Sequence, residues 1–213
     1  MKLLALPLLA FALVAAKPVP VPEVSALPVN APAEVAANPA NKLILQLSNG
    51  GTVTILMRPD AAPQQVERIQ TLVRQGFYDG TIFHRVIPGF MAQGGDPTGT
   101  GEGGSKLPDL KAEFNSLPHL RGTVAAARAE SEDSANSQFY IMFAPRASLD
   151  HNYTVFGRVI SGMDVVDKIA PGEPPANPTK IVHASLGDGS APAAPVQQPA
   201  ATPAATGGST PGK

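Results

Sequence analysis

Apolar side chains recur in this sequence mostly at the spacing of β-strands. Short runs that alternate between apolar and polar residues, or that gather β-branched and aromatic residues, are typical of strands. Such runs occupy residues 43–47, 52–57, 122–127, 138–143, 154–159 and 181–184, and two more flank the turn at Pro88-Gly89. Many short strands in close succession favour an antiparallel arrangement over a parallel sheet.

A helical period occurs in two places. Between Pro63 and Gly76 apolar residues recur at three- and four-residue intervals: Val66, Ile69, Leu72 and Val73. Pro63 suits the first turn of this helix and Gly76 ends it. A second, shorter helix is expected over 162–169. The whole pattern predicts a mainly β domain, a closed antiparallel β-barrel of about eight strands capped by two α-helices.

Composition changes at both ends of the chain and sets the domain boundaries. Residues 17–40 carry repeated prolines among Ala and Val, so we expect a semi-extended linker; a recognition segment for a Pro-binding partner is the alternative. Residues 188–213 consist mainly of Ala, Pro, Gly, Gln, Ser and Thr, which cannot build a core, and we expect a disordered tail. The folded domain is therefore expected over 41–187.

The first 16 residues have the composition of a secretory signal peptide. Lys2 gives a positive start, the apolar run from Leu3 to Val14 is too short to span a membrane, and Ala15-Ala16 offers a cleavage site. We expect cleavage after Ala16, a periplasmic or secreted location, and no integral membrane segment afterwards. An uncleaved N-terminus that serves as a loose anchor is the alternative.

Composition excludes several classes of function. Charged residues make up 15% of the 213 residues and the net charge is −1, so no basic surface for nucleic acid is expected. Cys is absent, which excludes disulfides and thiolate chemistry. The four His lie on separate segments, so we expect no metal site; His84 is interpreted as a hydrogen-bonded strand residue.

A glycine-rich stretch lies near the middle of the chain. Residues 99–104 satisfy the G-x-G-x-x-G pattern, but Pro108 follows soon after and no helix opens there. A dinucleotide site is therefore rejected in favour of a surface loop.

The main candidate functional residues lie between Phe83 and Asp96. Arg85 lies among apolar residues where an unpaired guanidinium is costly to bury, so it is expected on an open, partly apolar surface. Met91 and Gln93 share one strand face. A fixed cation, an amide and large apolar side chains suit an apolar ligand with a carbonyl group to hold.

The stretch FHRVIPGFMAQGGD resembles the signature of the cyclophilin family of peptidyl-prolyl cis-trans isomerases. Further blocks follow in the order of that family: Gly76–Thr81, Ser137–Ile141, Leu149-Asp150 and Val155–Val159. The resemblance covers roughly residues 41–187. It implies an enzyme that accelerates rotation about X-Pro peptide bonds and needs no cofactor or metal.

The resemblance also implies roles for ten residues. Arg85 would donate to the prolyl nitrogen; a surface Arg paired with an acid is its alternative. Gln93 would bind substrate backbone and help to fix Arg85. The expected substrate-binding residues are Phe90, Met91, Ala127, Arg128, Gln138, Tyr140, Leu149 and Tyr153. Ordinary core packing is the alternative for the apolar members of this set.

Four positions depart from the family pattern. Arg128 replaces a common Asn, so only its backbone role carries over. Tyr140 replaces Phe and adds a hydroxyl that needs a partner, and Tyr153 replaces a His. Ser148 replaces a Trp associated with cyclosporin binding, which makes cyclosporin sensitivity doubtful.

The sequence thus predicts a monomeric, exported isomerase that acts on proline-containing polypeptides during the folding of exported proteins. A Pro-peptide binding module or holding chaperone with negligible turnover is the alternative.

Overall fold

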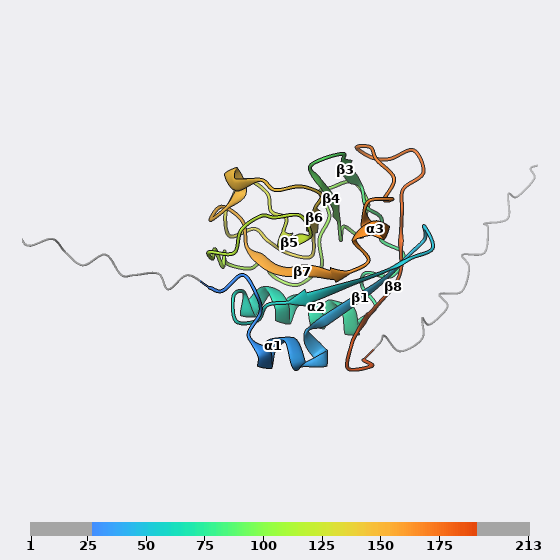
Figure 1. The fold of residues 1–213 in the computed structure, drawn as a ribbon. Helices are drawn as coiled ribbons and strands as arrows, with labels where there is room; N and C mark the ends of the chain where they lie inside the picture. The colour runs from blue at the N-terminus through green and yellow to red at the C-terminus, as the bar shows by residue number, and fades with distance from the viewer. Residues whose placement is uncertain (1–26, 191–213) are drawn as a thin grey trace, which may run out of the picture.

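The computed structural model describes residues 27–190 (Figure 1). The expected signal peptide, the first part of the expected linker and the expected tail beyond residue 190 lie outside this range. Within it, no helix is long and apolar enough to cross a membrane.

Eight strands form one antiparallel sheet. In chain order they are β1 Lys42–Leu47, β2 Thr52–Met57, β3 Arg85–Ile87, β4 Met91–Gly94, β5 Thr123–Ala126, β6 Phe139–Met142, β7 Val155–Ser161 and β8 Ile181–Leu186. In space the order is β3-β4-β6-β5-β7-β2-β1-β8. Each predicted strand is present at nearly its predicted residues. The turn between β3 and β4 contains Gly89 with a φ of 72°, the backbone conformation that made Gly suitable there.

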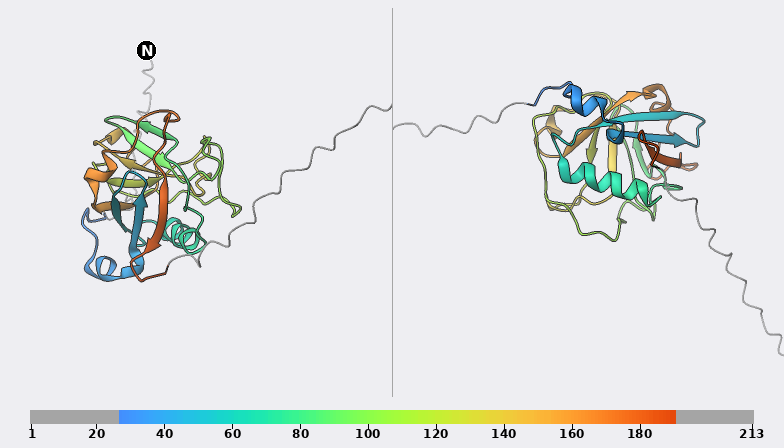
Figure 2. Two further views of the ribbon diagram at one scale, coloured as in Figure 1. Left: turned by 90° about the vertical axis from the view of Figure 1, so that its right-hand side faces the viewer. Right: turned by 90° about the horizontal axis from the view of Figure 1, so that it is seen from below.

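The sheet curls into a half-barrel (Figures 1 and 2). Its two ends, β3 and β8, do not pair with each other as strands. Isolated bridges join Ile82 to Lys180 and Val86 to Gly172 across this gap. The antiparallel, mainly β architecture is therefore as expected, and backbone hydrogen bonds between its two ends are local rather than a continuous ladder.

Both expected helices are present, and neither extends beyond its predicted residues. They are α2 Pro63–Arg74 and α3 Met163–Val166. The apolar face predicted for α2 is buried: Val66, Ile69, Leu72 and Val73 are at most 2% exposed. They join the main core with strand residues such as Leu45 and Ile55, and Figure 2 shows α2 alongside the curled sheet.

The residues just before the expected domain are folded rather than extended. Residues 33–37 form a short helix, α1 Ala33–Ala37, and η1 Pro39–Asn41 is a 3₁₀ turn. The expectation of an extended linker up to residue 40 is therefore wrong for this part of the chain. Its prolines sit at helix boundaries, where Pro is tolerated, so proline content alone did not reveal the turns between them.

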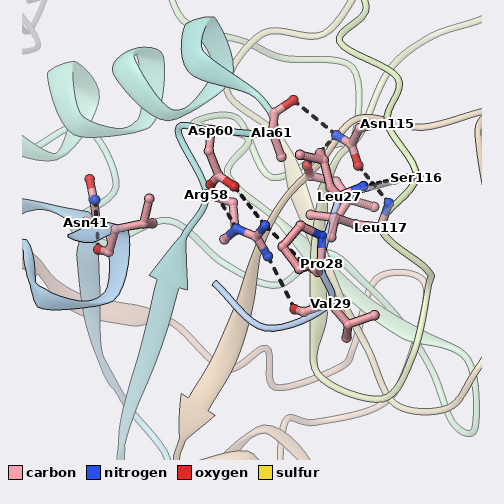
Figure 3. A network of polar contacts seen from close by, with 12 residues as sticks. Leu27, Pro28, Val29, Asn41, Arg58, Asp60, Ala61, Asn115, Ser116 and Leu117 are labelled. Carbon is pink, nitrogen blue, oxygen red and sulfur yellow. Dashed lines mark hydrogen bonds and ion pairs between the residues drawn. The ribbon is translucent and has the colours of Figure 1, made fainter. Parts of the chain in front are cut away.

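Residues 27–41, here called the N-terminal strap, are bound to the domain by Arg58 (Figure 3). The Arg58 side chain is buried and donates to the carbonyl oxygens of Pro28 at 3.1 Å and Val29 at 3.3 Å. It also donates to both carboxylate oxygens of Asp60 at 2.8 Å. The amide of Leu27 donates to Ser116 Oγ at 2.8 Å. One buried cation therefore joins the strap to the end of β2.

Candidate active site

Nearly all of the predicted site residues line one hollow. It has a volume of about 140 Å³. Its lining residues are Arg85, Phe90, Met91, Gln93, Ala127, Arg128, Tyr140, Leu149 and Tyr153. Of the ten predicted residues only Gln138 is missing from this lining, and it lines the adjacent hollow, whose volume is about 510 Å³. The structure thus brings together residues that lie as much as 68 positions apart in the sequence, from Arg85 to Tyr153.

Strand register explains why these side chains meet. Arg85 on β3 lies opposite Gln93 on β4, and Gln93 lies opposite Tyr140 on β6. Met91 and Gln93 are two positions apart on β4 and both line the hollow, as the period of a strand requires. Leu149 comes from the 3₁₀ turn η2 Ala147–Leu149.

The hollow has an apolar base and a partly polar rim. Met91, Tyr140 and Ala127 are buried, while Phe90 and Leu149 pack at the edge of the same apolar cluster. The rings of Tyr140 and Tyr153 meet edge to face, with centroids 5.8 Å apart, a favourable aromatic geometry. Apolar walls with a few polar groups are typical of a small-ligand site.

Arg85 lies at the rim with its charge paired. Its Nε donates to Oε2 of Glu173 at 2.9 Å, and the two side chains are 41% and 51% exposed. The alternative drawn from the sequence, a surface Arg paired with an acid, therefore fits this side chain as well as a role in the pocket does. Glu173 was missed because it lies 88 residues away in a loop, and no local pattern connects the two.

Gln93 does not hold Arg85 in this structure, contrary to expectation. Its Nε2 instead donates to Oε1 of Gln138 at 2.9 Å. Gln138 in turn donates to the carbonyl oxygens of Gly101 and Gly103 at 2.9 and 2.8 Å. Gln93 is therefore tied to the glycine-rich loop, because the Gln138 side chain bridges β4 and that loop.

The glycine-rich loop borders the site and is organised by Asp96. The Asp96 carboxylate accepts hydrogen bonds from the amides of Thr98 at 2.7 Å, Gly101 at 2.6 Å and Gly103 at 3.2 Å. Burial alone would raise the pKa of Asp96, but these bonds and the Thr98 hydroxyl outweigh it and lower the pKa to about 2. The loop is thus held by a charged carboxylate.

Asp96 should make part of the stability of this domain dependent on acid pH. Its folded pKa of about 2 lies below the ordinary 3.8, so the stabilisation is complete above pH 4 and is lost as the pH falls from about 4 to about 2. The shift corresponds to about 2 kcal/mol. Urea unfolding at several pH values should show this loss in the wild type. Asp96→Asn should be less stable than the wild type at pH 7, and its free energy of unfolding should change less between about pH 4 and pH 2. A pH dependence as steep as that of the wild type would contradict this assignment.

Arg128 lines both hollows. Its guanidinium donates to the carbonyl oxygens of Ala129 and Glu130 at 3.0 Å and of Asn152 at 3.2 Å. It also lies 4.8 Å from the ring centre of Tyr153. Two of the four departures from the family pattern, Arg128 and Tyr153, therefore contact each other through a cation–π interaction.

The hydroxyl of Tyr140 has found the partner that its burial requires. It lies 3.0 Å from Nε2 of His119, and Nδ1 of that ring lies 2.9 Å from Oδ1 of Asp150. Burial lowers the pKa of His119, although Asp150 opposes the shift, and burial raises the pKa of Tyr140. A neutral imidazole therefore joins Asp150 to the pocket. The sequence predicted the need for a partner but gave no sign that it is His119.

Replacing Tyr140 with Phe should test this chain. The hydroxyl would be lost and Nε2 of the buried His119 would have no partner, which costs about 1–3 kcal/mol. Because the apolar ring remains, catalytic turnover should change little. Thermal unfolding and a peptide isomerisation assay measure the two effects. A variant as stable as the wild type would show that this contact contributes nothing.

His84 differs from its expected state. It is buried beside β3, and neither ring nitrogen has a hydrogen-bond partner among residues 27–190. Burial lowers its pKa, with Asp96 opposing and Arg85 adding to the shift. No protein group within the described residues therefore supplies the hydrogen bond that the sequence interpretation expected for this ring. In this part of the chain no group of three metal-ligating side chains is found.

Fold and site together describe a curled antiparallel β half-barrel with an arginine at the rim of a small, partly apolar hollow. Residues 42–186 match the family model described as cyclophilin type peptidyl-prolyl cis-trans isomerase/CLD. Because this match covers most of the chain, the protein belongs to the cyclophilin-type peptidyl-prolyl cis-trans isomerase family.

Curated relatives carry the same activity in their names. A probable peptidyl-prolyl cis-trans isomerase from Brucella suis is 48% identical over 167 residues, which covers 71% of this chain and 85% of the relative. Peptidyl-prolyl cis-trans isomerase A from Dickeya dadantii is 44% identical over 133 residues, 60% of this chain and 70% of the relative. The protein is accordingly a peptidyl-prolyl cis-trans isomerase of this type.

Solved structures agree with the fold. A cyclophilin from Hirschia baltica has a TM-score of 0.65 at 30% identity and covers 70% of this chain and 74% of its own. A Cryptosporidium parvum cyclophilin-type isomerase, crystallised in the presence of the dipeptide Ala-Pro, has a TM-score of 0.63 at 26% identity. That match covers 68% of this chain and 98% of the other.

Proposed function

We propose that this isomerase accelerates rotation about X-Pro bonds by donating a hydrogen bond from Arg85 to the prolyl nitrogen. The barrier to rotation is about 18–20 kcal/mol because the C–N bond has partial double-bond character. In the twisted state the nitrogen becomes pyramidal and gains a lone pair. A donor fixed near that nitrogen stabilises the twisted state over both planar states, which is the requirement for catalysis.

The observation that carries this proposal is the position of Arg85 at the rim of an apolar hollow. Its Nε is bound to Glu173, and within residues 27–190 its two terminal amino groups make no hydrogen bond. These groups can therefore donate to a substrate carbonyl and to the prolyl nitrogen together, because a guanidinium is planar and always charged.

The other pocket residues supply binding and orientation. Phe90, Met91, Tyr140 and Leu149 hold the proline ring by apolar contact. Gln93 has an amide that can bind substrate backbone. The N–H of Ala127 donates to the carbonyl oxygen of Gln138 at 3.0 Å, so a substrate strand beside it pairs instead with its carbonyl oxygen and with the backbone of Arg128. No residue needs a cofactor for this chemistry.

Two structural details also belong to the proposal. We expect the two ends of the half-barrel to meet and close it into a barrel. The bridges at Ile82–Lys180 and Val86–Gly172 support this closure. We expect the enzyme to act as a monomer, since residues of one chain complete the pocket.

The composition of residues 1–16 supports export, and we propose that the enzyme works in the periplasm or outside the cell. Its substrates there would be exported proteins whose folding waits for proline isomerisation. N-terminal sequencing of the protein purified from fractionated cells checks this part of the proposal. A mature protein that begins at Lys17 in the periplasmic or secreted fraction supports it, and a full-length cytoplasmic protein contradicts it.

Refolding of a protein limited by proline isomerisation separates the enzyme from a holding chaperone. An isomerase accelerates the slow phase, which otherwise takes on the order of 10–100 s, when present at far below the client concentration. A holding chaperone would raise the yield only near equal amounts and leave the rate unchanged. That second result would favour the alternative function.

A further inference from the structure

Two backbone hydrogen bonds hold the loop that carries Glu173 beside the strand that carries Arg85. The amide of Val86 donates to the carbonyl oxygen of Gly172 at 2.8 Å, and the amide of Gly172 donates back to Val86 at 3.0 Å. Arg85 and Glu173 are the chain neighbours of this pair. Backbone hydrogen bonds therefore place the two side chains together, independently of their charges.

The atom through which Arg85 is held distinguishes it from two other paired arginines of the domain. Arg121 gives both terminal amino groups to Asp167, at 2.9 and 2.6 Å. Arg58 uses Nε and both terminal groups for Asp60 and the strap. Arg85 is held by Nε alone, at 2.9 Å from Glu173. This contact fixes the guanidinium and leaves its terminal donors for the hollow.

We propose that Glu173 is a positioning residue that orients the guanidinium of Arg85 for catalysis. This inference rests on the proposed role of Arg85 as the donor. Glu173 does not line the hollow, so it acts through Arg85 rather than on the substrate. A partly exposed Arg samples many rotamers, and a donor held in place before the substrate binds stabilises the twisted state without further reorganisation.

Two other roles for Glu173 make different predictions. If the pair only stabilises the fold, its loss should matter little, because exposed ion pairs contribute about 0–1 kcal/mol, and turnover should not change. If Glu173 competes with the substrate for Arg85, its removal should make the enzyme faster. A positioning role alone predicts slower turnover in a stable protein.

The test compares Glu173→Ala, Glu173→Gln and the wild type on a short Ala-Pro peptide. We expect Glu173→Ala to lower kcat by about tenfold with KM changed less than twofold, because misplacement of a catalytic group slows the chemical step. Glu173→Gln should recover most of the rate, since its amide oxygen can still accept from Nε of Arg85. Asp167→Ala, which removes the partner of another exposed arginine, should leave kcat unchanged.

A double substitution separates this inference from the proposed function. If Glu173 acts through Arg85, adding Glu173→Ala to Arg85→Ala should cause no further loss. If Arg85→Ala alone has no effect, the proposed donor is wrong. If Arg85→Ala slows the enzyme but Glu173→Ala leaves kcat unchanged, raises it, or changes only KM, the positioning role is overturned and the donor stands.

Discussion

Replacing Arg85 with Ala is expected to lower kcat/KM for a short Ala-Pro peptide by about 10²–10³, or about 3–4 kcal/mol of transition-state stabilisation, by analogy with loss of one preorganised donor. The substitution removes the donor at the rim and leaves the apolar hollow intact. Peptide binding should therefore weaken less than turnover. A protease-free isomerisation assay and calorimetric titration of the peptide measure the two effects.

Arg121→Ala is the matched control for this prediction. Arg121 is also an exposed arginine paired with an acid, but it lies outside the hollow. Its loss should leave the rate within about twofold of the wild type, because surface substitutions away from a site have small effects. Equal losses in the two variants would show that the rate responds to surface charge rather than to a donor at the prolyl nitrogen. Unfolding curves must show that both variants are folded.

Replacing Arg58 with Ala is expected to destabilise the protein by about 3 kcal/mol, the typical cost of removing one partner from a buried ion pair. The Arg58 side chain is 5% exposed in its pair with Asp60. Its removal leaves that carboxylate and the carbonyl oxygens of Pro28 and Val29 without their donor. The pairing lowers the pKa of Asp60, so the difference between wild type and variant should shrink as the pH falls through the acid range.

Urea unfolding of the wild type and of Arg58→Ala measures this loss. Arg74→Ala provides the control, because Arg74 is exposed and lies 3.9 Å from Asp188, and we expect it to change stability by less than about 0.5 kcal/mol. If Arg58→Ala is as stable as Arg74→Ala, the strap is not held by the contacts that Arg58 makes.

Local pattern was sufficient to predict most of the fold. The alternation of residues 52–57 gave β2, and the spacing of Val66, Ile69 and Leu72 gave α2, because one buried face imposes a period on the sequence. Neither pattern tells how near the two ends of the sheet come to each other. That outcome depends on contacts between distant segments, such as Ile82 with Lys180.

The pocket could be predicted because its central residues fall within one continuous block, and others, such as Tyr140 and Leu149, fall within recognisable shorter blocks. Arg85, Met91 and Gln93 are set by the register of two adjacent strands. The residues that support them could not be found in the same way. His119 and Glu173 come from loops, and each is identified only by the side chain that it contacts in space. The strap was missed for a similar reason, since Arg58 binds backbone carbonyl oxygens, which have no sequence signature.

The most direct test is the rate of cis–trans exchange in a short Ala-Pro peptide, measured by NMR exchange spectroscopy with a small molar fraction of the wild-type protein. We predict that exchange takes far less than the uncatalysed time of about 10–100 s. In Arg85→Ala the acceleration should be smaller by about a hundredfold or more. Exchange at the uncatalysed rate, in a peptide that still binds the hollow, would contradict it and leave a binding module.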